Sequence, residues 1–154
     1  MTKVFTYQLP ELPNKNGRVY PRESFDKACF DYMKKIENKT SLGELGHPSG
    51  LDVSLQNCSH LIEDIRLRYN RLPRKKKKLM KKQGKWEIWK DMNRCVKLDV
   101  KILKTPKGIV AKSIIDKIGI DSLDIGLRGM GNVQKDGTIE NVKIMSWDLI
   151  NKKA

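Results

Sequence analysis

The stretch that decides the fold is Val96-Lys97-Leu98-Asp99-Val100-Lys101-Ile102, in which apolar and charged residues alternate. This period is typical of a strand with one buried face and one solvated face. A second alternating run, Ile65, Leu67 and Tyr69, lies on the other side of a basic segment. The pattern therefore predicts two neighbouring strands of a hairpin, joined by an insertion.

The insertion, at about residues 71–90, is strongly basic. It contains ten Lys and Arg residues and one acid, and so carries nine of the fourteen net positive charges of the chain. Repulsion within its lysine run favours a solvated loop or a fraying helix. If it binds a partner, that partner is polyanionic, and the phosphate backbone of nucleic acid and an acidic protein are both open. The candidate binding residues are Arg71, Arg74, Lys75, Lys76, Lys77, Lys78, Lys81, Lys82 and Lys85.

Two helices are predicted from apolar stripes. The first begins after Pro21, and its stripe has the spacing of one helical face: Phe25, Ala28, Cys29, Tyr32, Met33 and Ile36. The second is capped by Thr105-Pro106 and ends at Gly119, and its predicted apolar side is Val110, Ile114, Ile115 and Ile118.

After the second helix comes a glycine-rich segment, residues 124–133, and then a turn at 135–137. A final strand follows, with Val142 and Ile144 on one face and Met145, Trp147 and Leu149 on the other. Together these elements predict an α+β fold with mostly antiparallel strands and two helices.

The chain of 154 residues, 38% hydrophobic and 32% charged, is of the size of one domain spanning residues 1–154. It has no apolar run near the roughly 18 residues of a membrane helix and no signal-peptide pattern, so a cytosolic protein is expected. Neither HExxH nor CxxC occurs, so no metal or other cofactor is expected. The three cysteines are predicted to be reduced, buried thiols: Cys29, Cys58 and Cys95.

Two histidines are candidates for chemistry. In Gly43-Glu44-Leu45-Gly46-His47-Pro48, the proline keeps His47 out of helical geometry and the glycines allow a tight turn. His47 is therefore either an imidazole presented at a loop edge or a turn residue that bonds the backbone. His60 begins a predicted strand, where a partly buried ring with satisfied nitrogens is the simpler interpretation.

Four segments, taken in order, resemble the prohead core protein proteases of tailed phages. They are residues 13–21 (PNKNGRVYP), 42–48 (LGELGHP), 62–65 (IEDI) and 125–131 (IGLRGMG). The resemblance runs from about Pro13 to Leu149. It implies a serine protease fold related to herpesvirus assembly proteases, with a closed or nearly closed antiparallel β-barrel flanked by two helices.

The same resemblance implies the positions of an active site. His47 matches the general base, Gly126 and Leu127 stand where the family has two serines, and Asp148 matches an acid that orients the histidine. Arg128 and Gly129 match the segment beside the nucleophile, with a part in backbone geometry or anion binding. Glycine has no side chain to attack a carbonyl carbon, so we expect a serine protease homologue without activity.

The hypothesis that follows is a phage head-assembly protein that has lost catalysis and acts as a structural or binding component of the head. Its expected partners are shell, scaffold or other head proteins, nucleic acid through the basic insertion, and further copies of itself. It would be found in the host cytoplasm during assembly and then in the virion head.

Other interpretations stay open. The chain could be a working maturation protease that cleaves scaffold and capsid precursors, with the serine altered by mutation or the nucleophile displaced to Ser122. A Ser59 or Cys58 nucleophile beside His60 is a further version. The chain could also be a DNA-binding accessory protein whose barrel is a passive carrier, and Asp148 could be a strand-end acid facing water.

Overall fold

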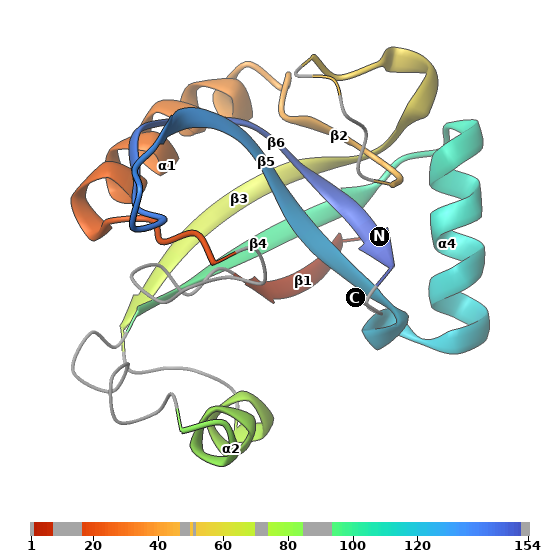
Figure 1. The fold of residues 1–154 in the computed structure, drawn as a ribbon. Coiled ribbons are helices and arrows are strands. Elements are labelled where there is room, and N and C mark those ends of the chain that lie inside the picture. The colour runs from red at the N-terminus through yellow and green to blue at the C-terminus, as the bar shows by residue number, and fades with distance from the viewer. Residues whose placement is uncertain are drawn as a thin grey trace.

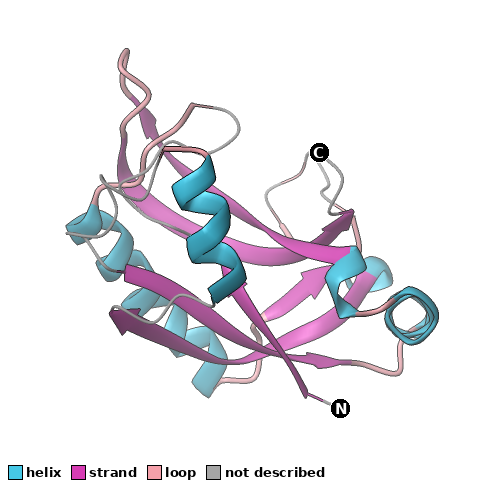
Figure 2. Cartoon of the chain, turned by 90° about the horizontal axis from the view of Figure 1, so that it is seen from below, coloured by secondary structure: helices cyan, strands magenta, loops and turns pink. Residues whose placement is uncertain are grey.

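The computed structural model describes residues 2–7, 17–46, 50, 52–69, 74–84 and 94–151. Within them the strands form two antiparallel sheets (Figure 1). The larger sheet has the order β1 (Thr2–Tyr7), β4 (Arg94–Ile102), β3 (Cys58–Tyr69), β2 (Leu42–Glu44). The smaller sheet is a pair, β5 (Leu123–Val133) and β6 (Ile139–Asn151). Figure 2 shows the strands gathered in two layers, with helices on either side of them and one helix in front.

The predicted pairing of the two alternating runs is confirmed. β3 and β4 are antiparallel neighbours, with Ile65 opposite Leu98 and Ile62 opposite Val100. These four side chains are buried, whereas the charged residues between them on β4, such as Lys97 and Lys101, are half-buried or exposed. The two-residue period thus sorts apolar residues to the core and charges to water.

The first predicted helix is also confirmed. α1 (Arg22–Glu37) begins after Pro21, whose extended backbone precedes the first turn. Its apolar stripe faces the core and packs mainly on β6 and β3. The most buried members of that stripe are Phe25, Ala28, Cys29 and Tyr32.

The second helix, α4 (Pro106–Ile118), has the predicted ends, but only part of the predicted apolar side faces the core. The Thr105 hydroxyl accepts a hydrogen bond from the Gly108 N–H at 3.0 Å, and Gly119 closes the helix with φ +113°. Val110 and Ile118 are 46% and 74% exposed, so their assignment to the apolar side was wrong. The predicted Ile115 is buried and the predicted Ile114 packs against the core, and the helix also buries Gly108 and Ala111. A side chain at 108 would overlap the Leu103 carbonyl.

The basic insertion contains a third helix, α2 (Arg74–Lys82). The turn that follows it contains Gly84, whose φ of +73° is readily adopted by glycine. The described residues therefore hold three α-helices, where the sequence pattern predicted two. They also contain two short 3₁₀ helices, Leu55–Asn57 and Ile120–Ser122, and none of the helices could span a membrane.

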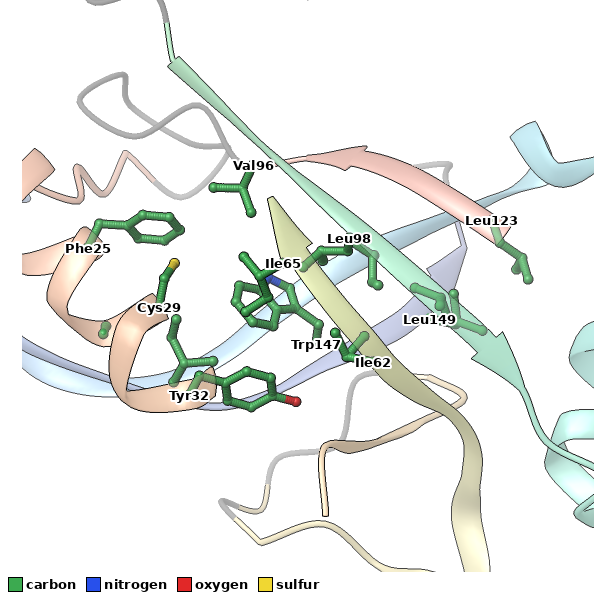
Figure 3. Close-up of a cluster of buried hydrophobic side chains, with 14 of the residues drawn as sticks. Phe25, Cys29, Tyr32, Ile62, Ile65, Val96, Leu98, Leu123, Trp147 and Leu149 are labelled. Carbon is green, nitrogen blue, oxygen red and sulfur yellow. The ribbon is translucent and has the colours of Figure 1, made fainter. Parts of the chain in front are cut away.

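The hydrophobic core lies between the two sheets and α1 (Figure 3). Trp147 of β6 is fully buried at its centre, and the Tyr32 ring meets it edge-on, with 4.9 Å between centroids. Edge-to-face contacts of this kind add about 0.5–1.5 kcal/mol to the stabilisation from burial.

The glycine-rich segment is a strand of a hairpin. β5 contains the whole stretch and pairs with β6 along its length, with Gly126 opposite Asp148 and Arg128 opposite Ser146. The register then shifts, so that Gly129 faces Ile144 and Met145 is an extra residue. This bulge changes which face of β6 is buried, and explains why Ile144 and Trp147 both reach the core.

The two sheets meet where β2 ends. An isolated parallel bridge joins Leu45 to Leu149 of β6, and the Gly46 N–H donates to the Leu149 carbonyl at 2.7 Å. The pairing in the described residues leaves two sheets, not one continuous cylinder. The closed barrel stays a prediction.

A buried histidine gives a second link between the sheets. His60 of β3 is fully buried; its Nε2 lies 2.7 Å from the Trp147 carbonyl and its Nδ1 2.8 Å from the Ser59 hydroxyl. A carbonyl only accepts, so Nε2 carries the proton and Nδ1 accepts from Ser59. Burial lowers the pKa of His60 to about 4, although the bond to Trp147 acts in the opposite sense.

This pKa predicts a loss of stability in mild acid. Unfolded His60 takes up a proton near its usual pKa of 6.5, whereas the folded ring resists it until about 4. The unfolded state binds more protons in this interval, so the free energy of unfolding falls as pH falls from 6.5 to 4. The contribution between pH 7 and pH 5 is about 2 kcal/mol, from 1.36 kcal/mol per pKa unit.

Urea denaturation of the wild type and of His60→Gln at pH 7 and at pH 5 measures this contribution. The glutamine variant is less stable at pH 7 but should lose about 2 kcal/mol less on acidification. Equal losses in the two proteins would contradict the assignment of the acid sensitivity to His60.

Candidate functional site

A buried cluster of one arginine and two acids lies where β2, β5 and β6 meet. Arg128 of β5, Glu44 of β2 and Asp148 of β6 have side chains that are 5%, 3% and 0% exposed. The Arg128 Nη2 donates to Glu44 Oε2 at 2.7 Å and to Asp148 Oδ1 at 3.1 Å. The Nε lies 3.1 Å from Asp148 Oδ2. The planar guanidinium can bond both acids at once because its donors point in fixed, different directions.

Further oxygens complete the surroundings of Arg128. Its Nε donates to the Ser146 hydroxyl at 3.0 Å, and its Nη1 donates to the carbonyls of Gly50 and Asp52 at 3.0 and 3.2 Å. Ser146 in turn donates to Asp148 Oδ1 at 3.1 Å, and so does the backbone N–H of Glu44. The anion-binding capacity that the sequence suggested for Arg128 is thus used by the acids of the protein itself.

Gly126 lies beside this cluster. It is the register partner of Asp148, and it is two residues from Arg128 on the same strand, so positions 126 and 128 share one face of β5. The structure therefore brings together Gly126, Arg128 and Asp148. Asp148 is fully buried, so the interpretation of a strand-end acid facing water is wrong.

Gly129 has a role in backbone geometry. It stands at the bulge, and a Cβ there would lie 2.8 Å from the carbonyl oxygen of Lys143 on β6. Contacts this short are essentially never seen for a real Cβ, so the absence of a side chain lets the two strands approach.

His47 lies outside the described residues. The residue before it, Gly46, donates its N–H to the carbonyl of Leu149, which follows Asp148 in β6. The backbone that leads into His47 is therefore attached next to the Arg128 cluster.

The carboxylates raise the pKa values of neighbouring groups. The pKa of the Tyr32 hydroxyl on α1 is raised, mainly by burial and further by the charge of Asp148. The pKa of the Cys58 thiol is also raised, first by burial and then by Glu44, and Arg128 only partly opposes this. Cys58 is therefore held as a thiol, which is a poor nucleophile.

The other nucleophiles considered from the sequence are engaged elsewhere. Ser59 does hydrogen-bond His60, but both side chains are fully buried and the histidine is a weak base. Ser122 donates its hydroxyl to the Gly119 carbonyl at 2.6 Å, at the end of α4. Neither Cys29 nor Cys58 forms a disulfide, and both side chains are buried.

The described cations of the basic insertion lie away from the Arg128 cluster. In α2, the side chains of Arg74, Lys75, Lys78, Lys81 and Lys82 are exposed, and that of Lys77 is half-buried. Lys76 belongs to the same helix. Arg71 and Lys85 lie outside the described residues. Figure 1 shows α2 below the ends of β3 and β4, apart from α1 and α4.

Glu44 and Ser146 belong to the cluster but were not predicted as site residues. Glu44 was visible as the acid of the Gly43 to Pro48 segment, and a buried acid requires a buried cation. Ser146 gave no signal, because a serine two residues before an acid on a strand is usually solvated. No group of three His, Cys, Asp or Glu residues in the described chain is arranged to hold a metal ion.

Comparisons with known proteins agree with this fold. No family model matches the chain. The structure of the bacteriophage T4 capsid assembly protease matches with a TM-score of 0.70 at 20% identity, covering 97% of this chain and 80% of the other. The fold is therefore that of a phage capsid assembly protease.

A sequence relative points in the same direction. A segment of 60 residues is 38% identical to the prohead core protein protease of Enterobacteria phage T4. It covers 38% of this chain and spans only 28% of the length of that relative. In sequence and in fold, this chain is homologous to the T4 prohead core protein protease.

The cluster predicts a large effect of removing its cation. Arg128→Met should lower the free energy of unfolding by about 3–5 kcal/mol, because two buried acids lose their partner. Urea denaturation at pH 7 measures it. Adding Glu44→Gln and Asp148→Asn to this variant should recover part of the loss.

Arg66→Met is the matched control, because Arg66 pairs with Asp99 while the two side chains are 33% and 22% exposed. This half-exposed pair should contribute less than about 1 kcal/mol. An Arg128→Met variant as stable as the control would show that the cluster does not support the fold.

Proposed function

We propose that this protein is a phage head-assembly protein with a prohead protease fold that has lost catalysis and acts by binding. The observation that carries the proposal is Gly126 at the register position opposite Asp148, in a fold shared with a capsid assembly protease. Peptide hydrolysis by this class of site needs an oxygen or sulfur nucleophile next to a general base. The glycine at position 126 supplies neither an oxygen nor a sulfur nucleophile.

The remaining hydroxyls near the cluster support the same view. Ser146 is fully buried, and its oxygen is held between Arg128 and Asp148. Its proton is directed at a carboxylate that also accepts two N–H bonds, from Arg128 and Glu44, which makes that carboxylate a poor base. Among the described residues, the site therefore has an orienting acid and a buried arginine but no reactive hydroxyl in reach of substrate.

His47 is the general base that the site would have inherited, and Asp148 its orienting acid. The support is the attachment of Gly46 to Leu149, next to Asp148. Without a nucleophile, the imidazole has no proton to remove, and we propose that His47 and Asp148 are remnants with a structural role.

We further propose that the six strands enclose one nearly closed barrel. The Leu45–Leu149 bridge joins β2 to β6, and β1 approaches β5 at the other side of the sheets. The shared core, with residues from both sheets, supports this arrangement.

The proposed partners are other head proteins, either shell or scaffold, and further copies of this chain. The support is the homology to a prohead core protein protease, which by its name is a protein of the prohead core. The protein would meet these partners in the host cytoplasm and remain with them in the head. The exposed cations of α2 support an additional polyanionic partner.

Restoring the serine tests the loss of catalysis. The wild-type protein should not react with a fluorophosphonate probe, because it has no activated serine. The double variant Gly126→Ser, Leu127→Ser should become labelled at residue 126, and adding His47→Ala should abolish the labelling. Intact-mass and peptide mass spectrometry read out the adduct.

Two results would count against the proposal. A labelled serine in the wild-type protein, removed by Ser122→Ala, would support the working protease with a displaced nucleophile. A folded double variant that stays unlabelled would mean that position 126 is not the nucleophile position of this site.

A further inference from the structure

The exposed helix α2 has a high density of positive charge. Seven of its nine residues are Lys or Arg, and residues 74–84 contain no acid. No other described element makes more than marginal contact with α2. The helix is therefore not explained by packing within the described part of the fold.

Helix geometry gathers four of these cations into one stripe. Arg74, Lys78 and Lys82 are four residues apart, so each lies about 40° around the helix from the last, and Lys75 adjoins them within about 100° of Arg74. All four side chains are exposed. From Arg74 to Lys82 the stripe is about 12 Å long at 1.5 Å per residue, close to the width of the major groove of a DNA duplex.

We propose that α2 binds the phosphate backbone of double-stranded nucleic acid without reading its sequence. This inference deepens the binding role proposed above. It rests on that proposed function only because head assembly is where the protein would meet nucleic acid. The like charges of Arg74, Lys78 and Lys82 repel one another at four-residue spacing, and a row of phosphates turns that repulsion into attraction. The side chains that usually read adenine, Asn and Gln, are absent from the stripe.

An acidic protein is the competing partner, and the composition of α2 disfavours it. Protein interfaces are depleted in lysine and enriched in aromatic residues and methionine at their centres. The described surface of α2 offers six exposed or half-buried cations and one large exposed apolar side chain, Leu79. Lysine binds phosphate as a point charge and needs no shaped pocket.

Fluorescence anisotropy with two labelled 20-base-pair DNA duplexes of unrelated sequence tests the proposal on the full chain. Four phosphate contacts give a log-log salt slope of about −3.6, which is about a 100-fold loss of affinity between 50 and 200 mM salt. The two duplexes should bind equally within about threefold, as expected for backbone contacts alone.

The test variant is Arg74→Gln, Lys75→Gln, Lys78→Gln, Lys82→Gln. The control removes four exposed cations on α4, at the end of β4 and between these elements: Lys101→Gln, Lys104→Gln, Lys107→Gln, Lys117→Gln. Figure 1 shows α4 apart from α2. Both variants lower the net charge by the same amount. The test variant should lose most of the affinity, and its log-log salt slope should become less steep by about three to four units. The control should keep its affinity within about threefold of the wild type and its salt slope within about one unit.

Three outcomes would overturn the proposal. They are wild-type binding weaker than about 100 μM at physiological salt, equal losses in the two variants, and displacement of duplex by poly-glutamate as readily as by unlabelled duplex at equal charge. The last would assign α2 to an acidic protein. None of these results depends on fluorophosphonate reactivity, so failure of this inference and failure of the proposed loss of catalysis are separate results.

Discussion

The burial of one guanidinium among oxygens from three parts of the chain is the constraint on which the site depends. Arg128 of β5 bonds Glu44 of β2, Asp148 and Ser146 of β6, and the carbonyls of Gly50 and Asp52. Removing a charged group from water costs several kcal/mol even after relaxation, and only complete pairing offsets it. The end of β2, the hairpin of β5 and β6, and the backbone at residues 50 and 52 must therefore be in place together.

This constraint also explains how the site would tolerate the proposed absence of a nucleophile. The two acids are bonded to Arg128, and their positions require no substrate, metal or serine at position 126. A buried cluster that is satisfied internally remains stable when the reactive group is lost, whereas a site with unpaired buried charges would destabilise the fold. The Arg128 cluster would thus separate the stability of the fold from the chemistry that we propose has been lost.

Periodicity predicts much of this fold, and it fails where a second layer covers a surface. The stripe from Phe25 to Ile36 and the alternation from Val96 to Ile102 locate α1 and β4, because each element has one buried side. On β6, Ser146 and Asp148 alternate with Trp147 and Leu149, as on a strand with one solvated face. That polar face is in fact buried against Glu44 and Arg128, a contact between residues about 100 positions apart that no local pattern contains. On α4 the prediction failed for two residues: Val110 lies about 160° around the helix from the close approach at Gly108, and Ile118 is the last helical residue and is exposed.

The Arg128 cluster and α2 differ in whether their charges are buried or solvated, and this difference indicates that the two regions have different roles. In the Arg128 cluster, a low dielectric makes each pairing strong and leaves no capacity for an outside ligand. On α2, the cations of Arg74, Lys75, Lys78 and Lys82 are solvated, so each interacts weakly with a single counter-charge, and only a dense array of anions can bind them all at once. A buried cluster that holds the fold and an exposed helix that attracts a polyanion can change independently, because neither contributes a residue to the other. A protein of this fold can therefore lose peptide hydrolysis at one region and gain a binding partner at another without a change in its core.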